Sequence, residues 1–152
     1  MAVKPIPDGY HSVTPYLVMN DAAGAIDFYK KAFGATELFR MPHGDKIGHA
    51  EIKIGDCPIM LADENPQMGY VGPQALGGTP VSLMIYVEDV DTTYKEAIAS
   101  GATEMKPLQD QFYGDRSGTL KDPYGHVWTI ATHKEDVTPE EMDKRMAAAH
   151  GG

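Results

Sequence analysis

Two polar residues of different acid–base character alternate along one predicted strand, at His49 and Glu51. Their neighbours Ala50, Ile52 and Ile54 are apolar. Because successive side chains of a strand point to opposite faces, His49 and Glu51 share one face and the apolar residues share the other. An imidazole beside a carboxylate can transfer protons in catalysis, or can bind a divalent metal with help from another strand. A third interpretation stays open, in which both side chains only hydrogen-bond polar groups or face solvent.

A second candidate site surrounds Gly114, which lies between Tyr113 and Arg116. Glycine permits a bulge that can direct the arginine side chain toward a cavity. Its guanidinium could then hold a carboxylate or a phosphonate by two parallel hydrogen bonds. The alternative is an ion pair with Asp110 or Asp115.

The other side chains that could take part in catalysis have no second catalytic residue at a suitable spacing. Cys57 is the one cysteine of the chain, and it follows a turn at the start of a predicted strand. No activating base is near it in sequence, so we expect a small buried residue rather than a nucleophile. A single cysteine excludes an intrachain disulfide and a multi-cysteine zinc site. His11 is expected to be exposed at a strand end.

The composition of the chain argues against some classes of binding partner. The chain has 152 residues, of which 42% are hydrophobic and 23% charged, as is typical of one soluble globular domain. Its formal net charge of −9 argues against nucleic acid or an anionic membrane as a partner. No apolar run approaches the roughly 20 residues of a membrane-spanning helix, and the N-terminus lacks the apolar region of a secretory signal. We therefore expect a cytoplasmic location.

The elements that must position these residues repeat along the chain. A predicted strand at 11–19 precedes a helix at 22–33, whose apolar residues recur at spacings of three and four and which ends at Gly34. Three further strands follow, the last ending at Asp63. After a connection at 65–80 that is rich in glycine and proline, the same order of strand, helix and three strands recurs.

This repeat predicts an α+β fold of paired βαβββ modules with a short C-terminal helix. We expect a single domain over residues 1–152, with the first module at 10–64, the connection at 65–80, the second module at 81–133 and the helix at 138–149. Thr138 and Glu141 supply a capping box at the start of that helix.

Three segments carry a resemblance to a known superfamily. They are Ala25-Ile26-Asp27-Phe28-Tyr29 with Gly34, the junction Tyr86-Val87-Glu88-Asp89-Val90-Asp91, and Leu120-Lys121-Asp122-Pro123-Tyr124-Gly125-His126-Val127-Trp128. On these residues the chain resembles the glyoxalase/bleomycin-resistance/extradiol-dioxygenase superfamily, also called vicinal oxygen chelate (VOC) proteins, over about residues 11–133. Similarity to its PhnB-like group lies in Gly48-His49-Ala50-Glu51, Tyr113-Gly114-Asp115-Arg116 and the tail Glu135-Asp136-Val137-Thr138-Pro139-Glu140-Glu141.

The resemblance implies that each module curls its sheet around a cavity and that the protein is a homodimer. It also places the metal-ligand positions of metal-dependent relatives on Thr14, Met60, about Ser82, and Thr129. A thioether and neutral hydroxyls form a poor donor set for a divalent cation. We therefore expect neither the usual VOC metal site nor any other cofactor, with a divalent metal at His49 and Glu51 as the alternative.

Strand alternation within this fold predicts the lining of a cavity. The lining would consist of Tyr16, Tyr86, Met60, Met84, His49 and Glu51. It is apolar with few polar groups, which suits a planar or amphipathic small molecule. Trp128 and Ile130 are expected in the core under the helices instead. The alternative is that side chains fill the cavity.

These observations favour a metal-free VOC protein that binds a small organic molecule, by analogy with bleomycin-resistance proteins, which sequester a drug without catalysis. The candidate ligand-binding residues are Tyr16, Met60, Met84, Tyr86, Tyr113 and Arg116. The alternative is a lyase, isomerase or transferase in which His49 and Glu51 act as acid and base or as metal ligands. A structural or protein-binding role is a third hypothesis, which a filled cavity would favour.

Overall fold

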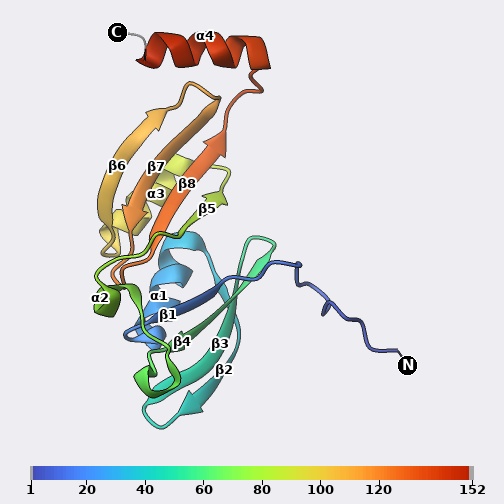
Figure 1. The fold of residues 1–152 in the computed structure, drawn as a ribbon, viewed down its shortest axis with the longest axis vertical. Coiled ribbons are helices and arrows are strands. Elements are labelled where there is room, and N and C mark those ends of the chain that lie inside the picture. The colour runs from blue at the N-terminus through green and yellow to red at the C-terminus, as the bar shows by residue number, and fades with distance from the viewer. Residues whose placement is uncertain (1, 151–152) are drawn as a thin grey trace. The chain divides into compact units, whose positions relative to one another are not determined.

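The computed structural model describes residues 2–150 and confirms the α+β architecture of paired βαβββ modules (Figure 1). Contacts divide the chain into two compact units. The first unit comprises the residues up to Pro80 together with Pro123–His126, and the second comprises Val81–Asp122 and the residues from Val127 onward. Each unit contains one sheet of four strands.

The first unit is a mixed sheet covered by one long helix. Its elements are β1 (Tyr16–Met19), α1 (Ala22–Phe33), β2 (Thr36–His43), β3 (Lys46–Ile54) and β4 (Cys57–Asp63). The strand order is β1-β4-β3-β2, with β1 parallel to β4 and with β3 antiparallel to both β4 and β2. The predicted connection also contains a 3₁₀ turn, η1 (Pro66–Met68), and a short helix, α2 (Pro73–Leu76).

The second unit repeats this plan. Its elements are β5 (Ser82–Tyr86), α3 (Val90–Ala99), β6 (Thr103–Asp110), β7 (Asp115–Lys121) and β8 (Val127–His133), in the order β5-β8-β7-β6. The predicted C-terminal helix is α4 (Pro139–His150), and Thr138 Oγ1 accepts a hydrogen bond of 3.2 Å from Glu141 N at its start. Across residues 2–150, the helices are all too short or too polar to span a bilayer.

The boundaries of α1 follow from local sequence. The Asp21 side chain accepts a hydrogen bond from Gly24 N, which satisfies one of the free amides at the helix start. Gly34 ends the helix with φ at 68°, a conformation that glycine adopts at little cost, and its N–H donates to Lys30 O. The apolar face of α1 is buried, as the three- and four-residue spacing predicts.

Alternation along the strands also holds as predicted. Ala50 and Ile52 on β3 are fully buried, as are Trp128 and Ile130 on β8. The Trp128 indole N–H donates to the buried carboxylate of Asp122 at 2.9 Å, so its polar atom is satisfied inside the core. Trp128 is therefore a core residue and not part of a ligand site.

One predicted strand is shorter than its sequence pattern indicated. β1 begins at Tyr16 and not at His11. Pro15 has no amide hydrogen to donate to a neighbouring strand, and only its carbonyl pairs, accepting from Met60 N at 3.0 Å. Residues 5–14 instead form an irregular segment, which we call the N-terminal strap, with a turn closed by Tyr10 N and Pro7 O at 3.1 Å.

Asp63, the last residue of β4, joins three elements of the first unit. Its Oδ1 accepts from Ala22 N at 2.8 Å, and its Oδ2 accepts from Ile47 N at 2.7 Å. One carboxylate therefore satisfies an amide at the start of α1 and another in β3. A charge at this place also interacts favourably with the helix dipole.

We expect Asp63→Ala to lower the free energy of unfolding by about 2 to 3 kcal/mol, because it removes a helix-terminal acceptor and leaves a second amide without its partner. Asp63→Asn should give a smaller loss, since its single amide oxygen can replace only one of the two acceptors. Urea denaturation measures both changes. Asp143→Ala, on the exposed side of α4, is the control; an Asp63→Ala value equal to that control would contradict the assignment.

Candidate functional site

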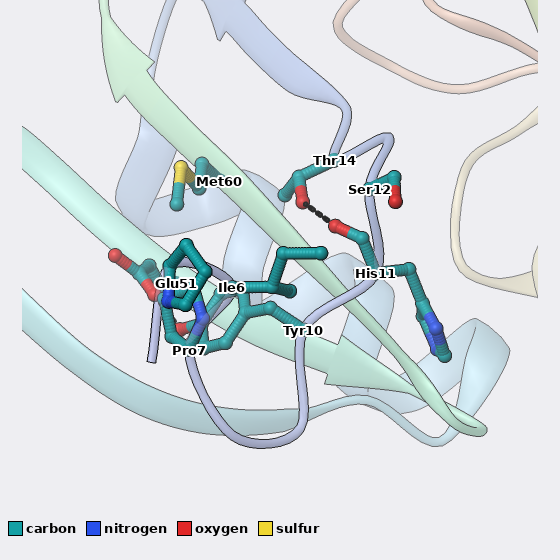
Figure 2. Close-up of a pocket in the computed structure, with 9 residues that line it drawn as sticks. Ile6, Pro7, Tyr10, His11, Ser12, Thr14, Glu51 and Met60 are labelled. Carbon is teal, nitrogen blue, oxygen red and sulfur yellow. Dashed lines mark hydrogen bonds between the residues drawn. The ribbon is translucent and has the colours of Figure 1, made fainter. Parts of the chain in front are cut away.

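The N-terminal strap and the first sheet form a pocket of about 410 Å³. It is lined by Pro5, Ile6, Pro7, Tyr10, His11, Ser12, Thr14, Glu51 and Met60. Figure 2 shows the strap residues Ile6, Pro7 and Tyr10 beside Glu51 on β3, with Met60 on β4. The volume lies within the range of about 300–1,000 Å³ that is usual for small-molecule sites.

A buried carboxylate forms the polar part of this pocket. The Glu51 side chain is only 9% exposed, and it accepts a hydrogen bond from the Tyr10 hydroxyl of the strap. Its other oxygen lies 2.8 Å from His49 Nε2. Burial of a carboxylate is costly unless donors satisfy its oxygens, and these two side chains supply a donor to each oxygen.

The hydrogen bonds continue from His49 to a second tyrosine. His49 Nδ1 lies 2.8 Å from the Tyr16 hydroxyl, so one connected chain runs through Tyr10, Glu51, His49 and Tyr16. With Glu51 ionised, Nε2 carries the imidazole proton and Nδ1 accepts from Tyr16. This arrangement holds the imidazole in one tautomer with its acceptor nitrogen toward Tyr16.

Aromatic rings surround the imidazole and fix its position. The Tyr16 and Phe39 rings lie 5.5 and 5.8 Å from the His49 ring, and the Tyr70 ring stacks on Tyr16 at 6.5 Å. These separations are typical of favourable aromatic contacts. His49 is therefore held by packing as well as by its hydrogen bonds.

Burial raises the pKa values of two groups in this hydrogen-bonded network. It raises the pKa of Glu51, because desolvation disfavours the carboxylate. Burial, with a smaller contribution from Tyr70, also raises the pKa of Tyr16. Tyr16 therefore keeps its hydroxyl proton near neutral pH and acts as a donor to His49.

The structure brings together four of the residues predicted for the first unit. Tyr16, His49 and Glu51 are connected by hydrogen bonds, and Met60 is the strand partner of both Tyr16 and Glu51. The sheet register thus places the Met60 thioether between Tyr16 and Glu51, two members of the hydrogen-bonded network. Glu51 and Met60 line the pocket, whereas Tyr16 and His49 lie on the same sheet beside it.

The second unit also carries residues that the sequence predicted for a ligand site. Met84 and Tyr86 lie on β5 with 46% and 62% of their surface exposed. The Tyr86 hydroxyl donates to the buried Asp115 carboxylate at 2.9 Å, and this bond is the main cause that raises the pKa of Tyr86. Asp115 also lies 2.7 Å from His133 Nδ1. Asp115 therefore ties β5, β7 and the end of β8 together.

Arg116 contacts Asp110, one of the two partners that the sequence suggested, but its main partner is a third carboxylate. Its guanidinium donates to both oxygens of Asp91, on α3, through Nε at 3.0 Å and Nη2 at 2.8 Å, with a longer contact of 3.4 Å to Asp110. Tyr113 is partly exposed, and its ring packs edge-on against Phe112. A ligand-binding role for Arg116 and Tyr113 stays a prediction.

The positions that the resemblance assigns to metal ligands carry only neutral donors. Thr14 Oγ1 donates to His11 O at 3.3 Å, and Thr129 Oγ1 shares a hydrogen bond of 2.9 Å with Thr119 Oγ1. Met60 offers a thioether and Ser82 an exposed hydroxyl. Hard divalent cations take oxygen anions, and zinc takes thiolate, imidazole or carboxylate, so none of these donors fits well.

Sequence analysis missed two features of the site. The sequence suggested no functional role for Tyr10 or the residues before it, but the strap supplies Tyr10 and much of the pocket wall. No spacing signal connects Tyr10 with Glu51, which lies 41 positions later. The expectation that Cys57 is buried is wrong: it is exposed, because it is the first residue of β4, beside the turn at Gly55 and Asp56.

Comparison with known proteins agrees with the fold. The family model described as Glyoxalase/Bleomycin resistance protein/Dioxygenase superfamily matches residues 9–130. The uncharacterized protein Rv0887c of Mycobacterium tuberculosis is 42% identical over 145 residues, which cover 93% of this chain and 85% of that protein.

Solved structures show the same fold. TioX from Micromonospora sp. ML1 is 28% identical with a TM-score of 0.64, and the match covers 84% of this chain and 100% of TioX. The PhnB protein from Bacillus cereus is 20% identical with a TM-score of 0.64, covering 80% of this chain and 99% of PhnB. At that identity the second likeness supports the fold alone.

The raised pKa of Glu51 predicts a specific pH dependence of stability. In the unfolded chain Glu51 titrates near its ordinary pKa of 4.5, so between pH 4.5 and the raised value the folded state binds more protons. The free energy of unfolding should therefore lose this contribution as pH rises through that interval. Glu51→Gln, which does not titrate, should not show this loss.

Urea denaturation of both proteins between about pH 4 and about pH 8 measures this difference. Glu96→Gln, on the exposed face of α3, is the matched control and should follow the wild type at every pH. A constant difference between wild type and Glu51→Gln across the range would contradict the assignment.

Proposed function

The chain belongs to the Glyoxalase/Bleomycin resistance protein/Dioxygenase superfamily, and we propose that it binds a small organic molecule in the pocket between the N-terminal strap and the first sheet. The observation that carries this proposal is a cavity of about 410 Å³ with a buried carboxylate, Glu51, in an otherwise largely apolar wall. Few polar groups in an apolar pocket orient a ligand, while the apolar wall provides most of the affinity.

The lining suggests an amphipathic ligand. Its apolar part would lie against Ile6, Pro7 and Met60, and its polar end would reach Glu51. A carboxylate accepts hydrogen bonds, so the matching ligand group is an amine or a hydroxyl. A cationic amine also fits the net charge of −9, which favours the approach of positive ligands.

We propose that binding requires none of the metal ions that some relatives use. The donors at Thr14, Met60 and Thr129 are neutral, and both threonine hydroxyls already take part in hydrogen bonds within their own units. No step of the proposed function passes through a metal at these positions.

Three finer assignments belong to the same proposal: membership of the PhnB-like group, a homodimeric state and a cytoplasmic location. The PhnB-like assignment is supported by Gly48-His49-Ala50-Glu51 and Tyr113-Gly114-Asp115-Arg116. The homodimer is supported by what the family resemblance implies.

A ligand screen by NMR tests the pocket directly. Uniformly ¹⁵N-labelled protein is titrated with a panel of amphipathic amines and planar aromatic compounds. We expect binders to shift the amide signals of Thr14, Glu51 and Met60. Met60→Trp should weaken their binding about tenfold or more, because the larger side chain occupies part of the cavity; tenfold equals about 1.4 kcal/mol.

Met68→Trp provides the matched control, because Met68 lies outside the pocket with 69% of its surface exposed. This variant should bind as the wild type does. Binders that shift other amides, or that bind Met60→Trp with unchanged affinity, would contradict the pocket assignment.

A second candidate function is acid–base catalysis, as in a lyase, an isomerase or a transferase. It is favoured by the connected hydrogen bonds of Glu51, His49 and Tyr16. In this mechanism Glu51 orients the imidazole and stabilises its protonated form, as the carboxylate does in hydrolytic triads. His49 Nδ1 takes the Tyr16 hydroxyl proton while the Tyr16 oxygen takes a proton from the substrate, so two protons each move one position, and the imidazole becomes positively charged as the substrate becomes a carbanion or enolate.

Exchange of carbon-bound hydrogen with D₂O tests this mechanism without knowledge of the substrate. The probes are small hydroxy ketones and keto acids with an acidic C–H beside a carbonyl. If an exchanging compound is found, His49→Ala should slow its exchange by about 10²- to 10⁴-fold while leaving the fold intact. His43→Ala, an exposed histidine at the end of β2, should exchange at the wild-type rate, and an unchanged rate in His49→Ala would remove this pair from the mechanism.

A further inference from the structure

Three potential metal ligands meet at the tip of the β3–β4 hairpin. They are His11 of the strap, Asp56 of the turn and Cys57 at the start of β4, and their ligand atoms all lie within 4.8 Å of one another. His11 Nε2 is 3.8 Å from Asp56 Oδ2, and Cys57 Sγ is 3.3 Å from Asp56 Oδ1. Among residues 2–150, no other group of three His, Cys, Asp or Glu side chains converges in this way.

We propose that His11, Asp56 and Cys57 bind one Zn²⁺ ion, with solvent in the remaining position. In a tetrahedral zinc site with bonds of about 2.0 Å to nitrogen or oxygen and about 2.3 Å to sulfur, neighbouring ligand atoms of this set are about 3.3–3.5 Å apart. The 3.3 Å between Cys57 Sγ and Asp56 Oδ1 has this spacing, and the 3.8 Å between His11 Nε2 and Asp56 Oδ2 is longer but shortens by rotation of these exposed side chains. A set of imidazole, thiolate and carboxylate ligands favours zinc over magnesium or calcium, which prefer oxygen ligands alone.

The fold explains why these side chains meet. Gly55, with φ at 58°, allows the tight turn between β3 and β4, and this turn exposes Asp56 and Cys57 at the hairpin tip. Figure 2 shows the His11 ring directed away from Glu51 and Met60. Its Nε2 lies 3.1 Å from Asp56 O, so the ring already sits against the turn.

The ion is expected to enter without a large rearrangement. All three side chains are exposed, so a hydrated ion can reach them and exchange its water for protein ligands. His11 gives up its contact with Asp56 O when Nε2 binds the ion. The Cys57 thiol releases its proton to solvent as the sulfur–zinc bond forms, and no oxidant or reductant is needed.

A zinc ion at this site would restrict the position of the strap. His11 and Asp56 are 45 positions apart, so an ion between them would link the strap to the hairpin tip. His11 is also part of the pocket lining, and zinc would therefore hold the strap over the pocket. The site goes beyond the proposed function, because its ligands and its test do not depend on an organic ligand.

Zinc and cobalt titrations of the reduced full chain test the site, with no organic compound present. We expect one Zn²⁺ per chain in competition with a chromophoric chelator. His11→Ala and Cys57→Ser should each weaken binding about tenfold or more, since even the loss of residues that only support metal ligands costs about 10- to 100-fold. Co²⁺ should give a sulfur-to-cobalt charge-transfer band that Cys57→Ser abolishes.

His43→Ala is the matched control and should bind Zn²⁺ as the wild type does, because His43 lies at the end of β2 and is not one of the three converging side chains. Absence of Zn²⁺ binding, or unchanged affinity in His11→Ala, would overturn the proposal. Loss of binding in His49→Ala would place the ion at His49 and Glu51 and would overturn it as well. A chain that binds zinc but no compound of the NMR panel would leave this site intact and remove only the proposed function.

Discussion

The burial of the Glu51 carboxylate is the constraint on which the rest of the candidate site depends. β3 alternates so that Ala50 and Ile52 enter the core, and Glu51 must then lie on the opposite face. A carboxylate with 9% exposure needs donors at both oxygens, and they come from His49 on the same strand and Tyr10 on the strap. Tyr10 thereby holds the strap against the sheet, and the pocket exists between them.

The two units share an order of elements but carry different side chains at equivalent positions. Asp63 accepts from the first amide of α1, and Thr132 accepts from Val90 N, the first amide of α3, so these two residues occupy equivalent places. Three positions earlier on each strand, Met60 pairs with Glu51, whereas Thr129 pairs with Thr119. The second unit therefore places a threonine pair where the first has a buried acid beside a thioether, and its own pair of carboxylate and imidazole, Asp115 and His133, lies at another register position.

Local patterns predicted the fold well because their causes are local. The end of α1 at Gly34 follows from glycine conformation, and the core position of Trp128 follows from strand alternation. The same alternation placed His49 and Glu51 on one face. It did not place Tyr10, because a contact across 41 positions leaves no periodic signal. The contact of Arg116 with Asp110, six positions away, was predicted, but its closer contact with Asp91 was not, since Asp91 lies on a helix 25 positions earlier.

The two candidate functions make opposite demands on the contact between Tyr10 and Glu51. A ligand with an amine or hydroxyl competes with the Tyr10 hydroxyl for the carboxylate, so binding is strongest where the strap yields that contact. Acid–base chemistry instead needs an ionised Glu51 to orient His49, and the Tyr10 hydrogen bond favours the ionised form against the desolvation that raises its pKa. Under these two hypotheses, the position of the strap would set the balance between ligand binding and catalysis. An ion at His11, Asp56 and Cys57 would hold the end of the strap without touching Glu51, and so could fix the pocket while leaving the Tyr10 contact open to exchange.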